Sequence, residues 1–139
     1  MKKIISLIIF TALLVASTAH ARIYIPIDQP SDQKFPIAIP NLQGNDEGEK
    51  IASIIRNDMW LSGYFRVVSS SGIEKFAEKE GISVEQIRFD YWTSIEAQAL
   101  VKGEVSREHG DIVITISLFD TFNHELLVGK QYKADEKHI

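Results

Sequence analysis

The stretch Asp46-Glu-Gly-Glu-Lys-Ile-Ala-Ser-Ile-Ile-Arg-Asn-Asp-Met-Trp-Leu-Ser-Gly-Tyr-Phe-Arg-Val-Val68 predicts a helix that leads directly into a strand. Asp46 and Glu49 have the spacing of a capping box at the helix N-terminus. Gly63 follows the helix, where glycine readily adopts a left-handed backbone. The apolar residues from Phe65 to Val68 predict a short buried strand. Helical spacing predicts the buried face of the helix: Ile51, Ile54, Ile55, Met59 and Ser62.

The flanking segments extend this unit. Before the helix, Phe35–Ile39 is an apolar run bounded by prolines, and it predicts a strand parallel to Phe65–Val68 with a right-handed crossover. After it, Ser71-Gly-Ile-Glu74 and Ser83-Val-Glu-Gln86 are further capping boxes that predict two short helical segments ending near Trp92. These segments have five apolar residues expected to point inward: Ile73, Phe76, Ile87, Phe89 and Trp92.

The last third of the chain has the period-two alternation of strands. Ala97–Val105, Asp111–Asp120 and Leu126–Tyr132 are separated by short polar turns and predict an antiparallel meander. Both faces of the middle strand are apolar, so both should be covered. The main helix can cover one face, while a second covering helix is missing, which suggests a C-terminal truncation. The predicted fold is α/β, a mixed sheet of about five strands packed against one main helix.

The N-terminus has the pattern of a secretory signal peptide. A basic start, the apolar run Ile4–Ala16 and the small-x-small site Ala19-His-Ala21 predict cleavage between Ala21 and Arg22. The apolar run is shorter than the roughly 20 residues of a membrane span. The expected organisation is a signal peptide at 1–21, an arm or edge strand at 22–33 and an α/β domain at 34–139.

Composition limits the compartment and the partners. The 139 residues contain no cysteine, which excludes disulfides, thiolate metal sites and lipid attachment at a cysteine. A net charge of −4 argues against nucleic acid or an anionic membrane as partner. Export without disulfides suits a bacterial periplasm, which is the expected location.

The segment Arg22–Gln33 has strand periodicity but cannot form a central strand. Ile23, Ile25 and Ile27 alternate with polar residues and prolines, and Pro26 removes a backbone donor. Two interpretations remain open: an edge strand of this domain, or an arm that adds to the sheet of another protein. The candidate partner-binding residues are Arg22, Ile23, Tyr24, Ile25, Pro26, Ile27 and Asp28.

No catalytic or cofactor-binding pattern is present in the sequence. The histidines after the leader, His109, His124 and His138, fall in turns and in the C-terminal tail, without ligand spacing. A glycine-rich phosphate loop and a Gly-x-Ser-x-Gly elbow are both absent. Trp60 lies off the apolar helix face, so it belongs either to a contact surface or under a loop. We therefore predict a non-enzymatic interaction domain without a metal or cofactor.

Several motifs, taken together and in order, resemble the amino-terminal domain of the TolB family. They are the signal peptide, Pro36-Ile-Ala-Ile-Pro40, Ile51–Asp58, Leu61-Ser-Gly-Tyr-Phe65, Trp92, Ala99-Leu-Val-Lys-Gly103 and the strand Ile112–Asp120. Of these, the helix-to-strand motif ending in Ser-Gly-Tyr-Phe is the most specific. The resemblance runs from about Arg22 to Tyr132.

The resemblance implies an adaptor of the Tol–Pal cell-envelope system, with roles in outer-membrane integrity, cell division and protein import. It implies that the mature N-terminus, here Arg22–Asp28 and onward, binds the periplasmic domain of TolA by adding a strand to its sheet. It assigns binding of the lipoprotein Pal to a β-propeller, so Pal is expected as a partner only if a propeller is present in the full-length protein.

Other interpretations remain at this stage. The chain could be a structural component of an outer-membrane secretion or assembly complex, because similar domains occur in curli-type export lipoproteins. A small periplasmic hydrolase is a third candidate.

Overall fold

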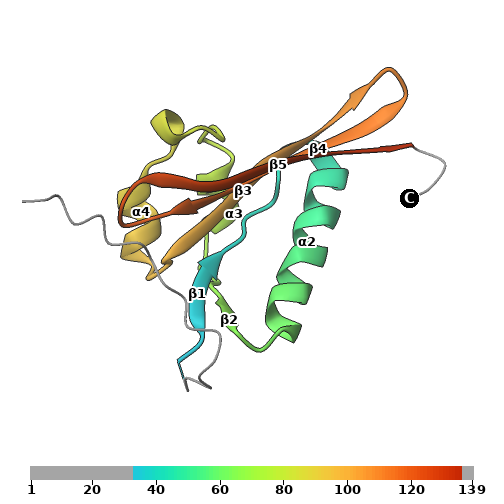
Figure 1. Cartoon of the computed structure of the whole chain (residues 1–139). Helices are drawn as coiled ribbons and strands as arrows, with labels where there is room; N and C mark the ends of the chain where they lie inside the picture. The colour runs from blue at the N-terminus through green and yellow to red at the C-terminus, as the bar shows by residue number, and fades with distance from the viewer. Residues whose placement is uncertain (1–32, 136–139) are drawn as a thin grey trace, which may run out of the picture. The chain divides into compact units, whose positions relative to one another are not determined.

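The computed structural model describes residues 33–135, which form a five-stranded mixed sheet with helices on both faces (Figure 1). The spatial order of the strands is β2-β1-β3-β4-β5. The strands are β1 (Phe35–Ala38), β2 (Phe65–Val67), β3 (Ala99–Glu108), β4 (Asp111–Asp120) and β5 (Glu125–Asp135). The helices are α2 (Asn45–Leu61), α3 (Ile73–Ala77), the 3-10 turn η1 (Val84–Gln86) and α4 (Phe89–Ser94).

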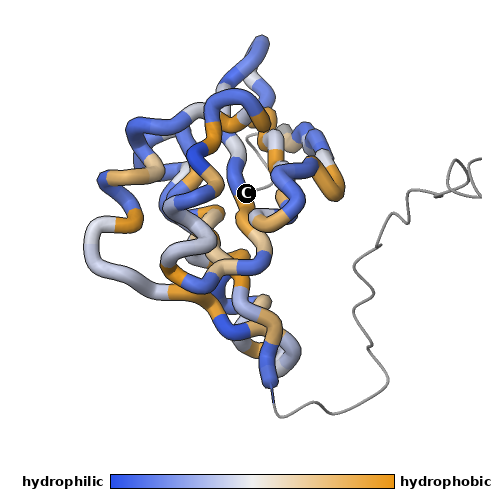
Figure 2. The backbone as a smooth tube through the Cα atoms, turned by 90° about the vertical axis from the view of Figure 1, so that its left-hand side faces the viewer, coloured by the Kyte–Doolittle hydropathy of each residue, from blue (hydrophilic) through white to orange (hydrophobic). Residues whose placement is uncertain are grey.

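The predicted topology is confirmed. Strand β1 pairs parallel with β2, Phe35 opposite Phe65, and parallel with β3, Ile37 opposite Ala99. Strands β3, β4 and β5 pair antiparallel as a meander, with a bulge where Leu118 and Phe119 meet β5. Hydrophobic and hydrophilic residues alternate over short stretches of the backbone (Figure 2), as expected where each element has one buried and one exposed side.

Helix α2 covers one face of the sheet and α3 with α4 covers the other, as the two sides of Figure 1 show. On the α2 face, Ala52 is fully buried among Ile37, Val101 and Ile112. On the opposite face, Trp92 and Phe119 are fully buried. Of the five predicted inward residues of the short helices, Ile73, Ile87, Phe89 and Trp92 are buried in this second cluster, and Phe76 is partly buried and packs against it. The side chains of β5 are exposed from Glu125 to Lys133, whereas β4 contributes the buried residues Ile112, Val113 and Phe119, so the helices within residues 33–135 leave the β5 edge of the sheet uncovered.

The predicted helix caps are wrong. Helix α2 begins at Asn45, one residue before Asp46, and its N-cap is Gly44 with φ 117° and no side-chain hydrogen bond. Helix α3 is likewise preceded by Gly72 with φ 87° instead of being capped by Ser71. A glycine adopts this left-handed backbone at little cost, whereas a capping side chain needs an extended backbone. Ser83 precedes η1 without forming a cap hydrogen bond to the backbone.

The predicted buried face of α2 is partly wrong. Ile51, Ile55 and Met59 pack on the sheet, but Ile54 is 60% exposed and Ser62 is exposed. The helix instead approaches the backbone of Leu42 and Gln43 with its smallest residue, Gly48. A Cβ atom placed on Gly48 would lie 2.1 Å from the carbonyl oxygen of Leu42. This close approach sets the position of the first helical turn.

We therefore expect Gly48→Ala to destabilise the fold. In an open helix position this change stabilises by about 1 kcal/mol. Here the methyl group meets backbone atoms that cannot rotate away, so we expect a loss of about 1–3 kcal/mol in the free energy of unfolding. Urea denaturation measures the effect, with Ser53→Ala, an exposed site on the same helix, as the control. Equal or greater stability of Gly48→Ala would contradict the close approach.

Candidate functional site

The predicted partner-binding residues Arg22–Asp28 and the predicted cleavage site at Ala21 lie outside the described residues. The described segment that follows these residues in sequence is the start of β1, which we call the entry point. There the backbone N–H of Phe35 donates a hydrogen bond of 2.8 Å to the carbonyl oxygen of Tyr64. The Phe35 and Phe65 rings meet edge to face, with centroids 6.1 Å apart. The entry point of the arm is thus fixed against the start of β2.

Three exposed apolar side chains lie at the end of α2 and on the turn that leads into β2. Trp60, Leu61 and Tyr64 are 62%, 63% and 56% exposed, respectively. We call these three residues the α2–β2 corner. The interpretation of Trp60 as part of a surface, made from its position off the apolar helix face, is supported by this exposure.

The turn that carries the α2–β2 corner is held by local hydrogen bonds. The hydroxyl of Ser62 donates to the carbonyl oxygen of Met59 over 2.6 Å and accepts the N–H of Tyr64 over 3.3 Å. Gly63 has φ 77°, the left-handed backbone predicted from its position after the helix, and its N–H donates to the carbonyl oxygen of Trp60. Local bonds of this kind fix the direction of the backbone between the helix and the strand.

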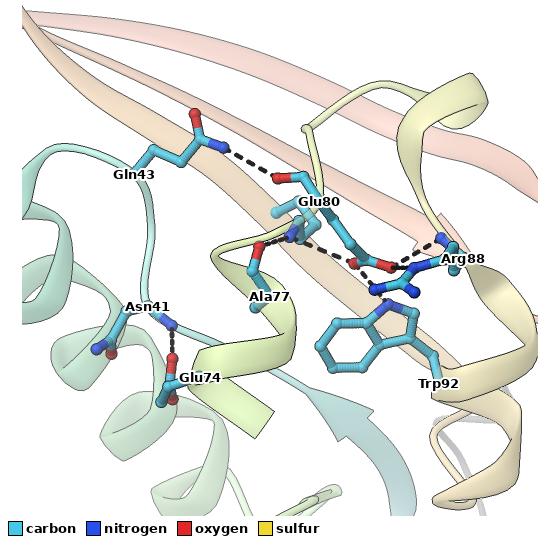
Figure 3. Close-up of polar contacts among 8 residues, drawn as sticks. Asn41, Gln43, Glu74, Ala77, Glu80, Arg88 and Trp92 are labelled. Atoms are coloured by element: carbon cyan, nitrogen blue, oxygen red, sulfur yellow. Dashed lines mark hydrogen bonds and ion pairs between the residues drawn. The ribbon is translucent and has the colours of Figure 1, made fainter. Parts of the chain in front are cut away.

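A second polar feature, on the other face of the sheet, is a buried charge network centred on Glu80 (Figure 3). Its carboxylate accepts the N–H of Arg88 at 2.8 Å and the indole Nε1–H of Trp92 at 3.0 Å. Lys102 lies with its Nζ 3.5 Å from Glu80 Oε2 and donates to the carbonyl oxygen of Ala77 over 3.0 Å. The network joins the end of α3 to α4 and β3.

Sequence reasoning missed this network. Glu80 and Lys102 are 4% and 3% exposed, yet in the sequence they resemble ordinary surface charges. Burial lowers the pKa of Lys102 from its usual 10.5, while the neighbouring carboxylate of Glu80 opposes that shift. The available signal was indirect: Lys102 stands inside the apolar strand Ala99–Gly103, on the face opposite Val101. A lysine at such a position needs a buried acid.

Two grooves lie on the surface of residues 33–135. A groove of about 400 Å³ is lined by Asn41–Asn45, Glu49, Glu74, Glu78 and Lys102, with no histidine or serine among its residues. A shallower groove of about 360 Å³ lies beside Phe76, Arg88 and His124. His124 stacks on Phe89, with ring centroids 4.7 Å apart. In the described part of the chain, no group of three histidine, cysteine, aspartate or glutamate residues is placed to hold a metal.

The fold and this entry point define a class: a small mixed α/β module, beginning with a βαβ unit and ending in an antiparallel meander, with an N-terminal extension. Within residues 33–135, no helix is long and apolar enough to cross a membrane. The chain belongs to the TolB amino-terminal domain family, whose model matches residues 23–127. The resemblance drawn from the sequence motifs is thereby confirmed.

Individual relatives agree with this assignment. The Tol-Pal system protein TolB of Syntrophus aciditrophicus is 30% identical over 125 residues, which cover 85% of this chain and 28% of the relative. The crystal structure of TolB from Acinetobacter baumannii matches 77% of this chain and 25% of that protein, with a TM-score of 0.59 and 19% identity. The C-terminal domain of LpoB from Salmonella enterica shares the fold, with a TM-score of 0.56 and 12% identity, over 78% of this chain and 87% of that one.

We expect Glu80→Gln to destabilise the domain strongly. The change leaves the Lys102 ammonium buried without a countercharge, and breaking a buried ion pair from one side costs about 3–5 kcal/mol. Glu78→Gln, a neighbouring exposed carboxylate, should change the unfolding free energy by less than about 0.5 kcal/mol. In a double-mutant cycle, Lys102→Met should cost less in the Glu80→Gln background than in the wild type. If the losses of unfolding free energy from Glu80→Gln and Lys102→Met simply add in urea denaturation, the two side chains do not interact.

The lowered pKa of Lys102 predicts a pH dependence. Between that lowered pKa and 10.5, the unfolded chain binds more protons at this residue than the folded chain does. The contribution of Lys102 to stability therefore rises as the pH increases through this window and is lost as the pH falls. The unfolding free energy of the wild type should increase relative to that of Lys102→Met when urea denaturation is repeated from neutral pH to about pH 10.5. If the difference in unfolding free energy between the wild type and Lys102→Met shrinks toward alkaline pH, the lowered pKa of Lys102 is contradicted.

Proposed function

We propose that this chain is the amino-terminal module of a periplasmic, non-enzymatic adaptor of the Tol–Pal system, and that its arm Arg22–Asp28 binds the periplasmic domain of TolA as an added strand. The observation that carries the proposal is the family match, which begins at residue 23 and so includes nearly all of the arm. Roles in outer-membrane integrity, cell division and protein import follow from this proposal. Pal binding stays outside it, because the chain spans 28% of the relative it matches and the resemblance assigns Pal to the propeller.

The arrangement of the sheet supports a partner-directed arm. All five strands of the sheet in residues 33–135 come from Phe35 onward. Strand β1, which follows the arm in sequence, pairs with a strand on each side. Strand β1 is thus already paired on both sides, and in this proposal the backbone groups of the arm pair with an edge of the partner's sheet instead.

Proline placement defines which edge of the arm faces the partner. In a strand, the N–H and C=O groups of one residue point to one edge, and those of the next residue to the other. Pro26 has no N–H, so the edge formed by Tyr24, Pro26 and Asp28 is the weaker pairing edge. The N–H groups of Ile23, Ile25 and Ile27 are then the ones that bond the partner strand.

Deletion of residues 22–33 should abolish binding of the mature chain to the cognate TolA periplasmic domain in isothermal titration calorimetry. The far-ultraviolet circular dichroism should stay unchanged, because the deleted residues precede every strand of the described sheet. Within the arm, Ile25→Pro should remove binding, whereas Tyr24→Pro should weaken it far less, since its N–H lies on the edge that Pro26 already interrupts. Undiminished binding after the deletion would contradict the proposed function. Equal losses in the two proline variants would contradict only the assigned edge.

A further inference from the structure

We propose that the α2–β2 corner, Trp60, Leu61 and Tyr64, is a second contact for the same partner domain that pairs with the arm. The inference rests on the proposed function and adds a surface to it. Its occupant is a periplasmic sheet domain with an open strand edge, whose apolar side chains beside that edge meet the corner. Two contacts, one made by backbone and one by side chains, would then hold one partner.

The composition and exposure of the corner fit a binding anchor. Tryptophan and tyrosine are enriched among the residues that dominate interface energies. Each of the three side chains is more than half exposed, and they lie within five consecutive residues. Large aromatic side chains present 150–250 Å² each, so covering the corner would bury roughly 300 Å² in addition to the strand contact. A standard interface buries about 800 Å² per partner, more than a narrow seven-residue strand offers.

The corner is held rigidly, which lowers the entropy lost on binding. Residues Trp60 and Leu61 end the 17-residue helix α2, and Tyr64 directly precedes β2. The Ser62 hydroxyl and the left-handed Gly63 close the turn between them. A Cβ added to Gly63 would touch nothing within 4 Å, so the turn stands clear of the rest of the domain. A partner can therefore approach it without rearranging the chain.

Covalent connection places the corner within reach of a partner bound to the arm. Tyr64 accepts the N–H of Phe35, the first residue of β1. Asp28 precedes Lys34 by six residues, so an extended chain separates them by at most about 20 Å. A domain paired along Arg22–Asp28 has a width comparable to this distance, since four strands span about 15–20 Å. The same domain can thus pair with the arm and cover the corner.

A comparable side chain far from the entry point provides the matched control. Tyr132 is 54% exposed, against 56% for Tyr64. It lies on β5 opposite Ile114, which pairs with Val105. Val105 is about 20 Å along β3 from Ala99, the residue beside β1. A general stickiness of exposed aromatic residues would affect both tyrosines, whereas a second contact beside the arm involves only Tyr64.

Calorimetry with the full mature chain and the cognate TolA periplasmic domain tests the inference. Trp60→Ala/Tyr64→Ala should raise the Kd by about 10- to 100-fold, Trp60→Phe should keep most of the affinity, and Tyr132→Ala should leave it unchanged. Thermal unfolding of each variant identifies any loss caused by misfolding, and the single variant Trp60→Ala, at an exposed position, should still raise the Kd if the double variant unfolds.

The outcomes separate this inference from the proposed function. If deleting residues 22–33 abolishes binding while the corner variants bind as the wild type does, the second contact is wrong and the proposed function stands. If the deletion leaves binding intact, the proposed function fails and the joint surface fails with it. A synthetic 22–33 peptide that binds the arm-deleted chain, and loses that binding in Trp60→Ala/Tyr64→Ala, would show that the corner receives the arm itself and would overturn the inference.

Discussion

The Glu80 carboxylate is the interaction on which the second face of the domain depends. That face is assembled from two short helices and a 3-10 turn, none long enough to be stable alone. One acid bonds the main chain at Arg88, the indole of Trp92 and, through Lys102, the strand β3. Since Trp92 is the largest fully buried side chain, its orientation by this acid sets the packing of the whole cluster.

The same network shows why part of the structure could not be predicted from the sequence. Period-two alternation identified Asp111–Asp120 with its observed bounds, because side-chain direction along a strand is a local property. The βαβ order and the inward residues of the short helices were predictable for similar reasons. The meeting of Glu80 with Lys102 is not local, and a charged residue carries no sequence mark of being buried. The predicted caps of α2 and α3 were wrong because a left-handed glycine, Gly44 or Gly72, directly precedes each of these two helices.

The two parts of the candidate site, the arm and the α2–β2 corner, could be predicted from the sequence to different degrees. The alternation in Ile23, Ile25 and Ile27 marks the arm in the sequence, although these residues lie outside the described part of the chain. Of the α2–β2 corner, only Trp60 could be predicted from the sequence as a surface residue. The exposure of Leu61 and Tyr64 depends on how the helix ends. The stretch Asp46–Val68, which decides the fold, thus also presents a surface at its glycine turn. A scaffold element and an exposed apolar surface therefore share one segment.

The interior position of β1 has a consequence for how the chain reaches its folded state. Strands β3, β4 and β5 are joined by short turns and can pair as soon as they are synthesised. Strand β1 instead pairs with β3 across about 60 residues of sequence, the kind of distant contact that slows folding. The meander should therefore form first and act as a template, and β1, α2 and β2 should join it afterwards. The N-terminal third of the domain is consequently the last part to fold, although it is the first to emerge.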